Sequence, residues 1–234
     1  MFKNFIKRIS ILKRKILYRK ISYSFGGVDL LINYIFKDKK KGVYVDVGSQ
    51  HPISNNNTYL LFKKGWTGVN IDLDPENIKL FNLCRKNDLN VCTALSSKIG
   101  EIDLFFYHDG SPINTVEKIV ANSHKKKFNE IKKIKTTTLN LLLEANNIEQ
   151  INYLNIDVEG HELHVLKGFD LAKYQPDTIS VEYLDLKMKK LEFKNNNLNS
   201  VLSSELYKHM IENNYSLINW SHADLIFINN KLKN

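Results

Sequence analysis

Five short apolar segments, separated by stretches with helical periodicity, most constrain the fold of this chain. Each has the length of a β-strand and is rich in Val, Ile and Leu. They cover residues 43–47, 67–72, 89–95, 151–157 and 177–184. Because helices between successive strands favour parallel pairing, this alternation predicts an α/β fold with a mainly parallel sheet and helices on both faces.

Other segments complete the predicted architecture. Residues 101–108 alternate like a more exposed strand, and residues 215–220 and 223–229 are typical of a closing antiparallel hairpin at the sheet edge. The stretch 109–135 interrupts the alternation with turn residues and lysines, so we predict an elaborated loop or lid there. A helix with a threonine cap is predicted over residues 136–147.

The net charge of +9 is concentrated at the start of the chain. Residues 1–20 contain eight basic residues and no acidic one, which leaves 26 basic and 25 acidic residues in the remainder. The basic residues are Lys3, Lys7, Arg8, Lys13, Arg14, Lys15, Arg19 and Lys20. A general nucleic-acid-binding protein would spread its charge over the fold, so we predict no nucleic-acid partner.

The same basic segment is amphipathic. Its apolar residues recur at helical spacing and are Phe2, Phe5, Ile6, Ile9, Leu12 and Ile16. A helix of this kind either lies on an anionic membrane or packs on the fold with its lysines in solvent, and the sequence favours neither. We predict a helical extension over residues 1–40 and one globular domain over residues 41–234.

Several absences bear on the compartment. No apolar run approaches the ~20 residues that span a bilayer, and the N-terminus lacks the apolar core and cleavage site of a secretory signal. Cys84 and Cys92 match no metal-binding spacing and are typical of a reducing compartment. We expect a cytoplasmic protein, with peripheral contact at the inner face of the membrane through residues 1–20 as an open alternative.

Acidic residues end four of the five predicted core strands. In order along the chain, the residues at the strand ends are Asp46 and Gly48, then Asp72, then Ala94 to Ser96, then Asp157 and Glu159, then Glu182. In an open parallel sheet, ligands bind beyond the carboxyl ends of the strands. These residues therefore form the candidate site, although an acid at a strand end can also simply cap a loop.

Gly48 and Asp72 predict a nucleoside at this site. A glycine allows close approach to the backbone, and Asp72 follows near the offset of ~20 residues at which an acid accepts hydrogen bonds from ribose hydroxyls. The loop over residues 49–58 is too long and bulky for a tight phosphate-binding turn. S-adenosylmethionine carries a ribose and an adenine but no phosphate, so it fits better than a dinucleotide. An NAD-dependent oxidoreductase and a catalytically inactive, membrane-attached binding protein remain the alternatives.

Four motifs together extend this interpretation. They are "VDVGSQHPISNNNTYLLFKKGWTGVNIDLDP", "TALSS", "LNIDVEGHELHVLKGF" and "PDTISVE". Through them the chain resembles, from about residue 42 to 229, the FkbM family of S-adenosylmethionine-dependent methyltransferases. The resemblance implies a class I methyltransferase (Rossmann-like) fold over residues 41–234, with a seven-stranded sheet whose last strand is antiparallel. It also implies transfer of the methyl group to a hydroxyl oxygen of a sugar, a glycan or a secondary metabolite.

The resemblance assigns roles to the cofactor residues. Asp46 and Gly48 would shape the methionine end of the site, and Asp72 would hold the ribose. The adenine would be bordered by Ala94, Leu95 and Ser96, and the loop residues Asn57 and Thr58 are included among the cofactor contacts. Asn155 stands where the family often has lysine, so the family's catalytic details do not transfer directly.

The carboxylates after the fourth and fifth strands carry the predicted chemistry. Methyl transfer to a hydroxyl requires removal of its proton, and we expect Asp157 to be the base, with Glu159 and Glu182 on the same rim. Alternatively, these three residues bind a divalent cation that acidifies the acceptor; we favour the base. His51 and His161 are candidate substrate contacts. A zinc motif is rejected, because His161 and His164 are three residues apart rather than four.

Overall fold

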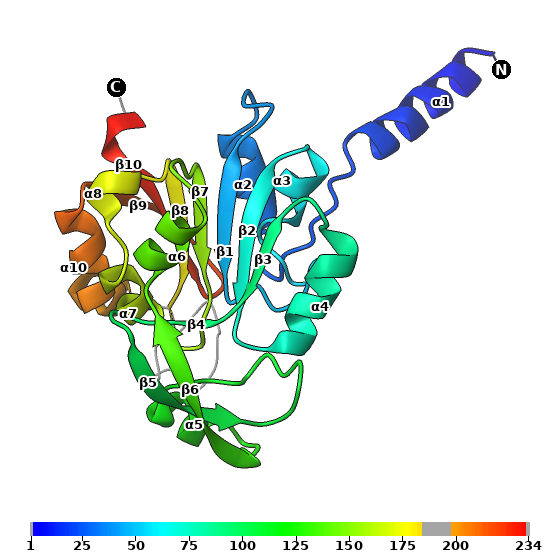
Figure 1. The fold of residues 1–234 in the computed structure, drawn as a ribbon. Coiled ribbons are helices and arrows are strands. Elements are labelled where there is room, and N and C mark those ends of the chain that lie inside the picture. The colour runs from blue at the N-terminus through cyan, green and yellow to red at the C-terminus, as the bar shows by residue number, and fades with distance from the viewer. Residues whose placement is uncertain (1, 184–197, 233–234) are drawn as a thin grey trace.

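The computed structural model describes residues 2–183 and 198–232, and within the first helix it leaves the side chains of residues 2–5, 15 and 16 undescribed. Residue 184 of a predicted strand, and the side chains of Phe2, Lys3, Phe5, Lys15 and Ile16, therefore lie outside the described part. The chain forms one large sheet, one small sheet and helices around them (Figure 1).

The large sheet has seven strands in the order β3-β2-β1-β7-β8-β10-β9. Their bounds are β1 (Val43–Val47), β2 (Thr67–Asp72), β3 (Leu89–Cys92), β7 (Tyr153–Ile156), β8 (Thr178–Glu182), β9 (Tyr215–Ser221) and β10 (Asp224–Asn229). Strands β3, β2, β1, β7 and β8 are parallel, and β10 runs antiparallel to both of its neighbours. The predicted seven-stranded, Rossmann-like sheet with an antiparallel last strand is confirmed.

Helices cover both faces of the large sheet, because the strands bury side chains on both sides. Val45 and Leu154 belong to a core built with α6 (Leu139–Ala145), α7 (Glu162–Lys167), α8 (Leu171–Tyr174), α9 (Leu198–Ser203) and α10 (Glu205–Glu212). Tyr44 and Tyr153 alternate with these residues along β1 and β7 and pack with α2 (Val28–Ile35) and α3 (Tyr59–Lys63). A short 3-10 helix, η2 (Asn230–Leu232), follows β10.

A small second sheet corrects one prediction. It contains β4 (Ala94–Leu95), β6 (Glu130–Thr137) and β5 (Gly100–Phe106), in that order, and lies below the large sheet in Figure 1. The single strand expected over residues 89–95 is wrong: the Thr93 amide bonds to the Asp72 carbonyl, and Ala94 pairs with Thr136 instead. The elaborated loop or lid predicted over residues 109–135 contains regular elements, namely α5 (Lys118–Ser123) and most of β6. Helix α6 begins after Thr138, whose hydroxyl accepts from the Leu141 amide.

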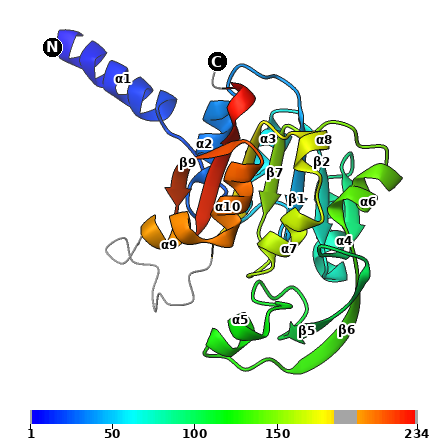
Figure 2. The ribbon, with the colours of Figure 1, turned by 90° about the vertical axis from the view of Figure 1, so that its left-hand side faces the viewer.

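The N-terminal helix α1 (Phe2–Leu17) extends away from the rest of the molecule in both ribbon views (Figures 1 and 2). Residues 6–14 are exposed, so the described part of this helix does not pack on the fold. In contrast, α2 buries Val28 and Ile32 completely. Among the described residues, no helix combines the length and apolarity needed to cross a membrane.

A buried arginine that follows α4 (Pro75–Cys84) joins the loop after β1 to the sheet. The Arg85 guanidinium donates to the carbonyl of Pro52, to Asn56 Oδ1 at 2.7 Å and to Thr58 Oγ1 at 2.8 Å. It also donates to Asn70 Oδ1 on β2 at 3.2 Å. The loop over residues 49–58 is thus held by a cation with no exposed surface.

Two buried carboxylates join the same network through the hydrogen-bond partners of this cation. Asp46 accepts from Asn56 and Thr58, both of which also contact Arg85. Asp88 accepts from the Tyr44 hydroxyl and from the Gly68 amide, and burial raises its pKa. Removal of the guanidinium would leave its buried acceptors without their donor and would remove a favourable electrostatic interaction with Asp88, and both losses are costly inside a protein.

We expect Arg85→Met to lower the free energy of unfolding by about 3–5 kcal/mol, because methionine replaces the stem but not the buried charge. Urea denaturation followed by circular dichroism measures this change. The neighbouring Lys86 is exposed, so Lys86→Met is the matched control and should stay within about 0.5 kcal/mol of the wild type. Equal stability of the two variants would show that the network contributes nothing.

Candidate active site at the reversal of strand order

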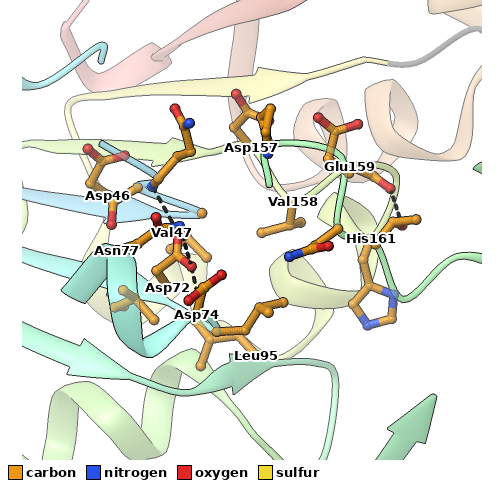
Figure 3. A pocket seen from close by; sticks show the side chains of 18 of the residues that line it. Asp46, Val47, Asp72, Asp74, Asn77, Leu95, Asp157, Val158, Glu159 and His161 are labelled. Atoms are coloured by element: carbon orange, nitrogen blue, oxygen red, sulfur yellow. Dashed lines mark hydrogen bonds between the residues drawn. The ribbon is translucent and has the colours of Figure 1, made fainter. Parts of the chain in front are cut away.

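A cavity of about 240 Å³ lies at the carboxyl ends of β1, β2 and β7, between the large and small sheets. The strand order reverses between β1 and β7, which is where open α/β sheets bind ligands. Figure 3 shows Asp46 and Asp72 on one side of the cavity and Glu159 and His161 on the other, with Leu95 between them.

The end of β1 is fixed by hydrogen bonds from the loop that follows it. Asp46 is buried and accepts from Asn56 Nδ2 at 3.0 Å, Thr58 Oγ1 at 2.8 Å and Asn155 Nδ2 at 2.8 Å. Asn57 donates to Asn155 Oδ1 and lines the cavity, whereas Thr58 is fully buried and does not line it. Asp46 and Thr58 therefore shape the wall, and Asn57 faces the cavity.

Position 48 requires a glycine for two reasons, its backbone conformation and its close contact with the backbone after β7. Its φ of 75° lies in the left-handed region, and a Cβ there would be 1.7 Å from the carbonyl oxygen of Asp157. The sequence predicts close approach of a ligand at this glycine. In the structure the backbone after β7 makes that approach.

Asp72 ends β2 and accepts hydrogen bonds from the loop backbone. Its Oδ2 accepts from the Gln50 amide at 2.8 Å, and its Oδ1 accepts from the Asp74 amide and from Asn77 Nδ2. Burial raises its pKa, and these hydrogen bonds oppose that shift. Asp74 caps α4 and also accepts from the Gly110 amide at 2.6 Å, which ties the segment after β5 to this side of the cavity.

The residues predicted to border the adenine fall into two groups. Ala94 and Leu95 line the cavity as an apolar wall, together with Ile102 of β5. Ser96 is buried outside it, and its hydroxyl lies 3.0 Å from Nε2 of His161. His161 Nδ1 in turn lies 2.6 Å from Glu117 Oε1, so a hydrogen-bonded chain links the small sheet to the segment before α5.

The predicted histidine contacts also differ from one another. His161 lines the cavity, but both of its ring nitrogens are engaged within the protein. His51 does not line the cavity; its Nδ1 accepts from the amides of Ile53 and Ser54 and closes a turn. His164 stacks on His161 with ring centroids 4.4 Å apart.

Asp157, Glu159 and Glu182 converge as predicted. Each has a carboxylate oxygen within 4.8 Å of the others. Burial, together with the neighbouring acids, raises the pKa of Asp157 to about 6 and that of Glu159 to about 8, and raises that of Glu182 well above its usual value. Glu159 has a left-handed φ of 53°, and Glu182 Oε2 is buried without a hydrogen-bond partner among the described residues. The three carboxylates lie close enough together to ligate one cation.

Comparison with protein-family models adds independent information. The model described as Methyltransferase FkbM domain matches residues 46–216, which is most of the chain. The chain belongs to the FkbM methyltransferase family. No curated protein sequence and no solved structure matches it. Membership in the FkbM family confirms the resemblance, and it supports a methyltransferase activity.

The structure of this FkbM protein places a fourth acid at the carboxylate cluster, one that was not predicted from the sequence. Asp224 pairs with Glu182 across β10 and β8 and lines the cavity. Burial raises its pKa to about 7, with a further contribution from Asp157. An antiparallel strand begins at the edge of the sheet where its parallel neighbours end. The first acid of the predicted hairpin is therefore the sequence feature that indicates a fourth carboxylate at this site.

A second omission is the stretch 111–116, which forms part of the cavity wall. Thr115 donates from its hydroxyl to the carbonyl of Glu159 at 2.8 Å. Val120 of α5 packs against Gly160, where a Cβ would be 2.7 Å from its methyl group. This part of the predicted lid does cover the site, although no motif in it revealed the contact.

The acidic cluster should make the FkbM protein less stable as pH rises from about 5 to 8. The folded acids keep protons that the unfolded chain releases near pH 4, so the stabilising effect is complete below that pH and is lost as pH passes their raised pKa values. Glu159→Gln should flatten this decline in urea titrations with a chelator present. Glu149→Gln, at an exposed site, should leave it unchanged. An identical slope in both variants would contradict the assignment.

Proposed function

We propose that this protein transfers a methyl group from S-adenosylmethionine to a hydroxyl group of a small molecule or glycan. The observation that carries the proposal is that one cavity brings Asp72 of β2 together with the carboxylates of Asp157 and Glu159. The reaction requires an acid that binds the ribose of the cofactor and a base that accepts the proton of the acceptor hydroxyl, and this cavity has a candidate for each at opposite ends.

The residues around Asp72 fit the nucleoside part of the cofactor. Among the described residues, Asp72 Oδ2 accepts one hydrogen bond, from the Gln50 amide, so a lone pair remains for a ribose hydroxyl. Ala94 and Leu95 offer an apolar surface for an adenine ring. The loop over residues 49–58 contains no glycine, which favours a cofactor without a pyrophosphate.

Unpaired polar groups in the cavity wall support a polar ligand. Ser49 Oγ and Ser111 Oγ are buried and have no hydrogen-bond partner within the part of the chain that the structure describes. A buried hydroxyl without a partner is destabilising, and a bound polar molecule removes that cost. Ser49 follows Gly48 directly, so it would contact the methionine end of the cofactor.

The carboxylate cluster supplies the proton acceptor. When bound, S-adenosylmethionine supplies a methyl group activated by a sulfonium. The acceptor hydroxyl must approach to about 3 Å and lose its proton to a nearby base. Asp157, with its pKa raised to about 6, is our candidate for that base, and Glu159 and Glu182 are its neighbours.

A divalent cation held by the same three residues is the alternative to a base. Carboxylate oxygens suit Mg²⁺, and the unpaired Glu182 Oε2 would gain a partner. The cation would acidify the acceptor hydroxyl directly. An NAD-dependent oxidoreductase is the rival enzyme, and isothermal titration with S-adenosylmethionine and with NAD separates the two cofactors.

Asp72→Ala should weaken binding of S-adenosylmethionine at least tenfold, because it removes charge-assisted hydrogen bonds worth about 1.5–3 kcal/mol each. Isothermal titration measures the affinity, and circular dichroism checks that the variant is folded. Asp38→Ala, at an exposed acid, is the control and should bind as the wild type does. Unchanged affinity in folded Asp72→Ala would show that another acid binds the ribose, and Asp74 would be the first candidate.

Asp157→Asn should lower turnover by about 10²–10⁴ while S-adenosylmethionine affinity is retained, because asparagine keeps the size but not the basicity. Release of S-adenosylhomocysteine with a panel of sugar and glycan acceptors measures turnover. Asp170→Asn, at a helix cap away from the cavity, is the control.

The metal alternative predicts a different pattern for the same variant. Partial recovery at high magnesium or manganese, together with loss of wild-type activity in chelator, would assign the cluster to a cation. Activity within a few-fold of wild type without any metal response would remove Asp157 from the mechanism.

A further inference from the structure

The exposed side of α1 carries apolar residues that no part of the described chain covers. Ile6, Ile9 and Leu12 follow one another at three-residue spacing and are 51%, 42% and 60% exposed. The helix leaves the body of the molecule, as both ribbon views show (Figures 1 and 2). An unpartnered apolar face on a projecting helix is typical of an interaction surface.

The charge of α1 specifies the chemistry of its partner. Residues 1–20 are free of acidic residues, and no ion pair among the described residues involves Lys7, Arg8, Lys13 or Arg14. Like charges within a 16-residue helix oppose its formation, and such a helix is only marginally stable alone. An anionic surface would remove this repulsion and bury the apolar residues at the same time.

The body of the molecule also carries basic side chains beside exposed apolar ones. A surface pocket of about 300 Å³ lies between the chain after α1 and helices α2 and α3. Its apolar residues are Ile21, Leu30, Tyr34 and Leu60, and its basic residues are Lys20, Lys37 and Lys64. Lysines around an apolar floor match the boundary between lipid headgroups and acyl chains.

We propose that α1 and this pocket form one docking surface for a membrane rich in anionic lipids. Helix α1 lies in the plane of the interface, with Ile6, Ile9 and Leu12 among the acyl chains and the basic residues at the headgroups. A nucleic acid would leave these apolar residues exposed. This proposal is independent of the methyl-transfer reaction.

Co-sedimentation of the full-length protein with vesicles tests the docking surface. At low salt, binding should be strong to vesicles of phosphatidylcholine with about one third phosphatidylglycerol and weak to phosphatidylcholine alone. The variant with Lys7, Arg8, Lys13 and Arg14 all changed to Gln should bind the anionic vesicles at least about a hundredfold more weakly, since each charge contributes roughly fivefold. A control variant changes Lys86, Lys125, Lys126 and Lys127, which are exposed elsewhere, to Gln and should retain binding.

Two further variants separate the parts of the surface. Changing Ile6, Ile9 and Leu12 to Asn preserves the charge and should reduce binding, because it removes three apolar side chains that the helix would place among the acyl chains. Lys37→Gln with Lys64→Gln should reduce binding by about tenfold or more. Wild-type binding by this pair would overturn the inclusion of the pocket.

Three results would overturn the whole proposal. One is equal binding of the full-length protein to neutral and anionic vesicles. Another is equal binding by the four-residue α1 variant and its control. The third is binding to duplex DNA with no binding to anionic vesicles.

Discussion

The buried guanidinium of Arg85 is the interaction on which the candidate site depends. It joins the loop after β1 to β2 through Pro52, Thr58 and Asn70. A loop of this length has no regular backbone pairing of its own, so its shape comes from side-chain contacts that a cation can make in several directions at once. The position of Gln50 over Asp72, and hence one wall of the cavity, follows from that anchor.

Buried polar groups of two kinds surround the cavity. Asp46 and Arg85 each make several hydrogen bonds within the protein, and their role is to hold the backbone. Ser49 and Ser111 line the cavity, and their hydroxyls are buried without a hydrogen-bond partner among the described residues. Since native proteins rarely leave such atoms unpaired, the two serines are candidate ligand contacts, whereas Asp46 and Arg85 fix the wall beside them.

The sequence predicts the large sheet well because its strands are buried on both faces and read as continuous apolar runs. It predicts the convergence of Asp157, Glu159 and Glu182 because parallel strands end at a common edge. Strand β6 escapes prediction because its lysines face solvent and its pairing with β5 is a contact between distant segments.

The role of Arg85 could not be predicted from the sequence, for a different reason. An arginine at the end of a charged helix is ordinarily exposed, and nothing local indicates that this one turns inward. The distinction between Thr58, which supports the wall, and Asn57, which faces the cavity, likewise depends on side-chain direction within an irregular loop.

The small sheet is separate from the large one: among the described residues, no strand of one sheet pairs with a strand of the other. It borders the cavity through Ala94, Leu95 and Ile102. The segment that joins β5 to β6 adds the contacts of Thr115 with Glu159 and of Gly110 with Asp74. None of these contacts belongs to the hydrogen bonds that set the register of β1 against β2 and β7. The cavity therefore has two walls with separate backbone hydrogen-bond networks, one in the large sheet and one in the chain between β3 and α6.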